Sequence, residues 1–105
     1  MQGTFRSEHA AQLHRCAGVC EEAAAAYVAR DDARDRELVS ALTLAAAALD
    51  TARHAVDERS PVVPTALLIA GTLARNAIAA AERRGLDTRL VQCVAELRRA
   101  IEACE

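Results

Sequence analysis

Small residues recur along the chain with the spacing 4-3-4 in four separate stretches. The sixteen positions are 16/20/23/27, 41/45/48/52, 70/74/77/81 and 93/97/100/104, and they hold ten alanines, four cysteines, one tyrosine and one leucine. Residues three and four apart share one side of an α-helix, so each set marks one helix face. The pattern predicts four helices whose inner faces follow the same stripe.

The second stretch carries the clearest heptad pattern. Its apolar positions follow the spacing 4-3-4-3-4, which is typical of the seam of a left-handed helix bundle: Leu38, Leu42, Ala45, Leu49, Ala52 and Val56. Alanine-rich windows such as 41–56 and 66–84 have high summed helix propensity, and we see no run with the period-two alternation of a strand. The sequence therefore predicts an all-α fold.

Capping residues set the expected helix ends at about 8–30, 33–57, 61–84 and 87–104. Ser7, Asp32 and Asp87 are suitable N-caps for the first, second and fourth helices. The third helix begins at Pro61 or with Pro64 in its first turn, and its sequence does not decide between them. Gly85 suits the residue after its C-terminus.

Connections of about two to five residues force successive helices to run antiparallel. We therefore expect residues 1–105 to form one domain, a single up-down-up-down antiparallel four-helix bundle. The only aromatic residues are Phe5 and Tyr27, so close helix contacts must replace large side chains in the core.

Charge and composition narrow the expected partners. The net charge is −2, with acidic residues and arginines interspersed, so we expect no nucleic-acid partner. No stretch reaches about 18 uninterrupted apolar residues and the first residues lack a secretory apolar core, so we expect no membrane partner and a cytoplasmic location. The absence of lysine and the excess of alanine suggest a bacterial genome rich in GC.

The cysteine pattern resembles a known family. Repeats of C-x3-C-x2-C-x3-C on four helices are the signature of the cysteine-rich four-helix-bundle copper storage proteins, and residues 13–104 resemble that family. The match is best at the two ends, in Leu13–Ala23 around Cys16 and Cys20, and in Cys93–Cys104. The resemblance implies an interior that holds Cu(I) on thiolates. Alanine fills all eight stripe positions of the two middle helices, so we expect a cysteine-depleted relative with few sites rather than a bulk store.

The candidate metal ligands are the four cysteines and one histidine: Cys16, Cys20, Cys93, Cys104 and His9. Cysteines four apart on one helix are too far apart to form a disulfide with each other, so Cys16 and Cys20 are expected to be free thiols. Thiolate and imidazole ligands select Cu(I) or Zn(II). Antiparallel geometry predicts Cys104 near the level of Leu13 to Cys16, and Cys93 nearer the level of Ala23 to Ala24.

Three other interpretations of the same residues stay open. Free cysteines also occur as small apolar residues in tight cores. The alanines could line a pocket for a small apolar ligand, which would make the chain a binding protein or an enzyme with His9, Tyr27 and a thiol as its polar groups. Exposed apolar residues such as Val28, Leu44 and Ile69 could mark a homo-oligomer interface. No familiar catalytic motif is present, so we expect a binding protein more than an enzyme.

Overall fold

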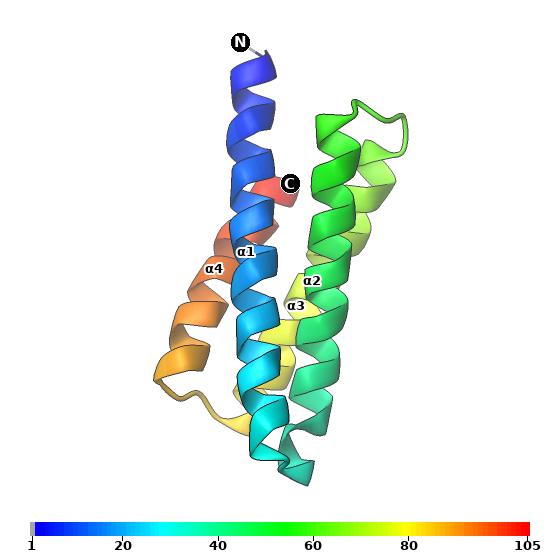
Figure 1. Ribbon diagram of the computed structural model, residues 1–105. Coiled ribbons are helices and arrows are strands. Elements are labelled where there is room, and N and C mark those ends of the chain that lie inside the picture. Colours follow the sequence, from blue (N-terminus) through cyan, green and yellow to red (C-terminus); the bar gives the residue numbers. More distant parts are fainter. Residues whose placement is uncertain (1) are drawn as a thin grey trace.

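The computed structural model describes the backbone of residues 2–105 and the side chains from Glu8 onward. Over this range the chain forms four α-helices and one short 3-10 turn: α1 (Gln2–Arg30), η1 (Ala33–Asp35), α2 (Arg36–Asp57), α3 (Val63–Arg84) and α4 (Thr88–Cys104). Successive helices lie side by side and run in opposite directions (Figure 1). The predicted all-α four-helix bundle is confirmed.

The helices pack as a closed ring, in which α1 and α3 each contact both α2 and α4. The longest dimension of the described chain is 44 Å. This length matches α1, because its 29 residues span about 43 Å at about 1.5 Å per residue. The 17 residues of α4 are far fewer, so the first turns of α1 extend past the end of α4 (Figure 1).

The predicted stripes form the inner faces of all four helices. Of their sixteen positions, only Ala41, Ala48 and Cys104 are partly exposed, and the others are buried. All six positions of the heptad stripe on α2 are buried as well. The inner face of α3 is made mostly of alanines and Gly71, whereas leucines of the other helices supply most of the bulk. Small side chains on α3 thus allow its neighbours to approach closely.

One predicted helix end is wrong. We expected the first helix to begin after Ser7, but α1 begins at Gln2 and Ser7 lies inside it. A serine is a favourable N-cap but it does not stop a helix, and no proline interrupts residues 2–7. The side chain of Ser7 lies outside the described residues.

The other ends follow the capping residues closely. Asp32 accepts a hydrogen bond from the backbone N–H of Arg34 and caps η1, which leads directly into α2. The structure also decides between the two prolines, since α3 starts at Val63 and holds Pro64 in its first turn. Gly85 ends α3 with a φ of 97°, a conformation that L side chains rarely adopt.

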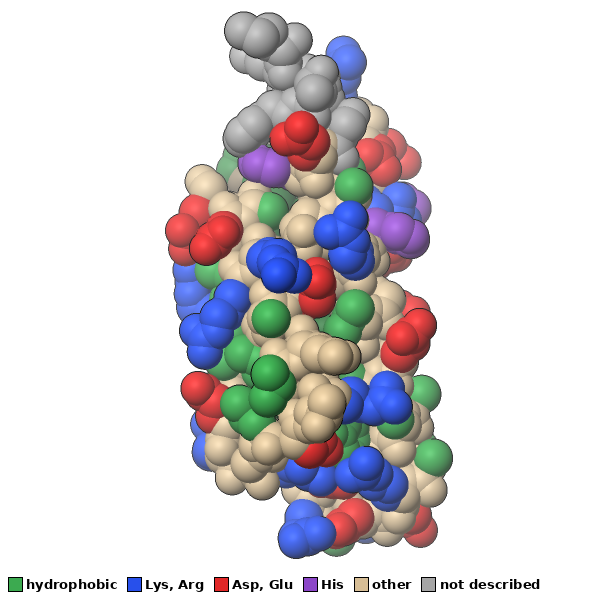
Figure 2. Space-filling model, turned by 90° about the vertical axis from the view of Figure 1, so that its left-hand side faces the viewer, with side chains coloured by type: hydrophobic (Ala, Val, Ile, Leu, Met, Phe, Trp, Pro, Cys, Tyr) green, Lys and Arg blue, Asp and Glu red, His purple; other side chains and the backbone are tan. Residues whose placement is uncertain are grey.

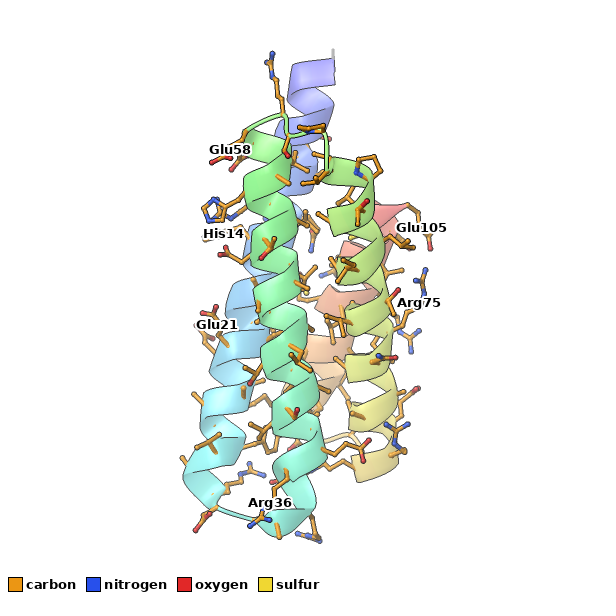
Figure 3. All side chains as sticks on the ribbon, turned by 90° about the vertical axis from the view of Figure 1, so that its right-hand side faces the viewer. His14, Glu21, Arg36, Glu58, Arg75 and Glu105 are labelled. Atoms are coloured by element: carbon orange, nitrogen blue, oxygen red, sulfur yellow. The ribbon has the colours of Figure 1, made fainter. Side chains whose placement is uncertain are left out.

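The outer surface is largely charged and mixed in sign. Figure 2 shows basic and acidic side chains interspersed over one face of the molecule. His14 and His54 are exposed, and Figure 3 shows His14 pointing away from the bundle. The apolar side chains of Val28, Leu44 and Ile69 are also exposed. Their exposure keeps the homo-oligomer interpretation open.

The outer face of α3 differs from this pattern. Within the described residues, α3 is the one helix long and apolar enough to cross a membrane by length and composition, with a mean hydropathy of 1.3. Only 28% of that apolar window is buried in the bundle. Helices of soluble bundles can meet the same criterion, so the expectation of no membrane partner stays a prediction.

Candidate metal centre

The four cysteines all face the interior of the bundle and none is in a disulfide. Cys16, Cys20 and Cys93 have no exposed surface, and Cys104 is partly exposed. Two lie on α1 and two on α4, and these helices are neighbours in the ring. The inward orientation on which the metal prediction depends is therefore present.

Cys20 joins the thiols of the two helices. Hydrogen bonds with the thiols of Cys16 and Cys93, together with burial, raise the pKa of Cys20 well above its usual range. The hydrogen bond with Cys20 lowers the pKa of Cys93, so Cys93 ionises before Cys20. We call these three residues the thiol cluster. The structure places Cys93 beside Cys20, about one turn from the expected level of Ala23.

Cys104 lies at the opposite end of α4 from Cys93. Burial, reinforced by the nearby thiol of Cys16, raises the pKa of Cys104 to about 11. On its other side Cys104 faces α3, where a Cβ added to Gly71 would lie 3.7 Å from the Cβ of Cys104.

His9 is partly buried on α1, seven residues before Cys16. Seven residues correspond to about 10 Å along a helix axis, and helical side chains lean toward the N-terminus. His9 therefore lies about two turns from Cys16 and further still from Cys20. The structure does not bring His9 together with Cys20 and Cys93.

The donor set suits a metal that needs few ligands. From Glu8 onward, no three side chains of His, Cys, Asp or Glu surround a common point where a metal ion would bind. The three thiols instead form a linked series, with Cys20 in contact with the other two. Zn(II) sites normally need four protein ligands, or three and a water. Cu(I) is held by soft thiolates and accepts two of them, so a pair such as Cys20 and Cys93 fits Cu(I) better.

Tyr27 lies at the end of the bundle where α1 ends and α4 begins. Its side chain is buried, and its hydroxyl donates a hydrogen bond to the carboxylate of Asp87. Asp87 also caps α4 by accepting from the backbone N–H of Leu90 at 2.9 Å. The guanidinium groups of Arg30 and Arg84 lie over the tyrosine ring, 4.7 and 4.9 Å from its centre. Tyr27 is therefore a core residue whose hydroxyl reaches the start of α4.

Two partners in this network were missed by sequence reasoning. Asp35 is buried and accepts a hydrogen bond from Nε of Arg84 at 3.0 Å. Both residues continue the inner stripes by one step of three, since Asp35 precedes Leu38 and Arg84 follows Ala81. The signal that could have identified this buried ion pair is a charged residue at the next position of an apolar stripe, close to a helix end. The network ties all four helices together.

The pKa of Tyr27 gives a spectroscopic test of this network. Burial and the hydrogen bond to Asp87 raise the pKa of Tyr27 to about 12, against about 10 in an unfolded chain. The stabilisation from this shift is present below pH 10 and is lost as the pH rises through the folded value. The chain has one tyrosine and no tryptophan, so its tyrosinate absorbance reports this group alone. We expect a midpoint near 12 in the folded protein and near 10 in denaturant, and a folded midpoint near 10 would contradict the network.

The pocket interpretation of the alanine-rich core needs His9 and Tyr27 in one cavity. They are 18 residues apart on one helix, which corresponds to about 27 Å along its axis. A single pocket would hold only one of them. The hollows among the described residues include open grooves on the surface. One lies between α2 and α3 and is lined by Leu44, Leu73 and Arg83 among others.

Comparisons with known proteins give no relative. No protein family, no curated protein and no solved structure matches the chain. The chemistry of the thiols and the geometry of the bundle are therefore the basis for a proposed function.

Proposed function

We propose that the protein binds one or two Cu(I) ions through the thiol cluster, with Cys20 shared between Cys16 and Cys93. The observation that carries the proposal is the burial of three thiols between the neighbouring helices α1 and α4, where Cys20 hydrogen-bonds with Cys16 and with Cys93. Buried cysteines that served only as apolar filler would need no such contact across two helices. The resemblance to the copper storage proteins supports the same metal.

The state of the thiols also supports a metal ligand over a reactive cysteine. Cys16, Cys20 and Cys93 have no exposed surface, whereas reactive cysteines combine a lowered pKa with an exposed sulfur. Burial and its hydrogen bonds also keep the thiol of Cys20 neutral by raising its pKa. A thiol must lose its proton when it binds Cu(I), so binding releases protons. Affinity for Cu(I) should therefore rise with pH.

The number of thiols limits how many Cu(I) ions the protein can hold. Four cysteines cannot hold the many ions of a store, and the middle helices α2 and α3 offer none. A small capacity suits buffering or transfer of single ions in a reducing compartment, where free thiols persist. The expected cytoplasmic location belongs to this proposal.

The test is a titration of the reduced protein with Cu(I) in competition with a coloured Cu(I) chelator. We expect at least one equivalent to be taken from the chelator, with affinity increasing between pH 6 and 8. A triple variant with Cys16, Cys20 and Cys93 replaced by alanine is the control, and it should take none. Less than one equivalent in the natural sequence would refute the proposal.

A further inference from the structure

The outward side of α2 and α3 is uncharged along most of its length. Residues 38–49 and 61–74 contain no charged residue, although 27% of the chain is charged. The opposite side of the molecule, which Figure 2 shows, carries interspersed acidic and basic side chains. The exposed and half-buried side chains on the outward side are apolar or small, and we call six of them the α2–α3 face: Ser40, Leu44, Ala47, Thr51, Ile69 and Leu73.

Much of the apolar surface of this face is not used by the bundle. Leu44 and Ile69 are 53% and 51% exposed. Leu44 and Leu73 line a groove of about 320 Å³ between the two helices, and Ile69 lies one turn before Leu73. Only 28% of the apolar window of α3 is buried. An uncharged, apolar surface that extends over two helices is typical of a protein interaction site.

The charged side chains at the two ends of α2 have opposite signs. Figure 3 shows Arg36 at one end of α2 and Glu58 at the other, and both residues are exposed. Ala47 lies eleven residues from each of them. Eleven residues make about three full turns, so all three residues lie on the same side of α2. A second α2 turned end to end therefore brings an acidic group opposite each Arg36.

We infer that the α2–α3 face binds a second copy of this chain, in a symmetric dimer whose two α2 helices run antiparallel and cross at Ala47. The two-fold axis pairs Arg36 with Glu58 of the partner subunit, and the same pair forms again at the other end. The apolar side chains of the face lose contact with water between the copies. The small side chain of Ala47 allows the two α2 helices to approach closely. The dimer does not depend on the proposed Cu(I) binding.

The face has the area that a reversible dimer needs. From Arg36 to Glu58 it is about 33 Å long at about 1.5 Å per residue, and two packed helices are roughly 18 Å wide. Each copy therefore contributes about 600 Å² and the pair about 1,200 Å², which exceeds the roughly 1,000 Å² of a specific interface but lies at the lower end of the range. We expect monomer and dimer to be in equilibrium at micromolar concentrations.

A lipid surface suits this face less well than a second copy. Helices that lie on a membrane combine large apolar or aromatic residues with flanking lysines and arginines. The chain has no lysine, and its two aromatic residues are both in α1. Ser40 and Thr51 are polar, and at a protein interface such hydroxyls find hydrogen-bond partners or bridging water.

Sedimentation equilibrium of the reduced, metal-free protein from about 1 to about 200 µM tests the dimer, because association depends on concentration. We expect the mean mass to rise from that of one 11.2 kDa chain toward twice that value. The reducing agent excludes disulfide-linked dimers. Leu44→Glu places a charge in the face and should weaken the dimer at least about tenfold. Val91→Glu is the matched control, because Val91 is 55% exposed on α4, and it should change the dissociation constant less than about twofold.

Arg36→Glu and Glu58→Arg test the antiparallel arrangement. Each change alone places like charges opposite each other at both ends of the dimer, so each should weaken it at least about threefold. The double variant exchanges the two charges and restores both pairs. It should regain the affinity of the natural sequence at low salt, where surface ion pairs are least screened. Circular dichroism of each variant shows that the bundle is intact.

The possible results lead to different conclusions. A strict monomer at every concentration would overturn the inference, and if that monomer binds phosphatidylglycerol vesicles and Leu44→Glu does not, the face binds lipid instead. A dimer that Leu44→Glu and Val91→Glu weaken equally would overturn the assignment of the face. A double variant that stays as weak as the single variants would overturn the antiparallel arrangement.

Discussion

Replacing Cys20 with alanine is expected to weaken Cu(I) binding at least about a hundredfold, because loss of outer-shell groups alone costs about 10- to 100-fold. Cys20 is the one thiol in contact with both other members of the cluster. Its loss leaves Cys16 on α1 and Cys93 on α4 without the sulfur that connects them. The measurement is the dissociation constant for the first Cu(I) ion, by competition with a chelator.

The matched control for this variant is Cys104→Ala, which removes one thiol from outside the cluster. It should retain nearly the affinity of the natural sequence. Alanine has high helix propensity and occupies ten of the stripe positions already, so both variants are expected to keep the fold. Equal loss of affinity in the two variants would show that no thiol has a special position.

Replacing Asp87 with alanine is expected to lower the free energy of unfolding by about 2–4 kcal/mol. The loss of the N-cap of α4 contributes about 1 kcal/mol. The remainder comes from leaving the buried hydroxyl of Tyr27 without its acceptor, at about 1–3 kcal/mol. Urea denaturation followed by circular dichroism measures the change as a lower midpoint.

Two variants separate these contributions. Tyr27→Phe keeps the cap and removes the hydroxyl, so it should cost about 1 kcal/mol. Asp57→Ala removes an exposed carboxylate whose partner is Arg53 on the same helix, and it should change stability by less than about 0.5 kcal/mol. A cost for Asp87→Ala no larger than that for Asp57→Ala would mean that the network adds nothing to stability.

The fold was predictable because one periodic signal runs through the whole chain. The stripe positions gave the number of helices and their buried faces, and Asp32, Gly85 and Asp87 gave most of their ends. The start of α1 was not predictable from Ser7, since a capping residue marks where a helix is able to begin and not where it must.

The site was predictable only in part, since residue spacing describes each helix alone. The inward orientation of Cys16, Cys20 and Cys93 followed from the stripe. The pairing of Cys20 with Cys93 depends on the axial offset between α1 and α4, which spacing within a helix does not fix.

The burial of Asp35 shows how far a stripe can be followed. The apolar stripe of α2 begins at Leu38. The inward position three residues before it holds Asp35, whose carboxylate is paired with Arg84 from α3. Buried charges need such a partner, and so the two residues are informative only together. Neither one alone would have identified the contact between η1 and α3.

X-ray absorption at the copper edge, on reduced protein carrying one equivalent of Cu(I), examines the thiol cluster itself. We expect a first coordination shell made of two sulfurs, because no three thiols surround a common point in the described residues. We expect no nitrogen, because His9 lies eleven residues, about 16 Å along α1, from Cys20. A shell containing nitrogen or oxygen donors, or a protein that retains no copper when desalted for the measurement, would contradict the proposed Cu(I) centre.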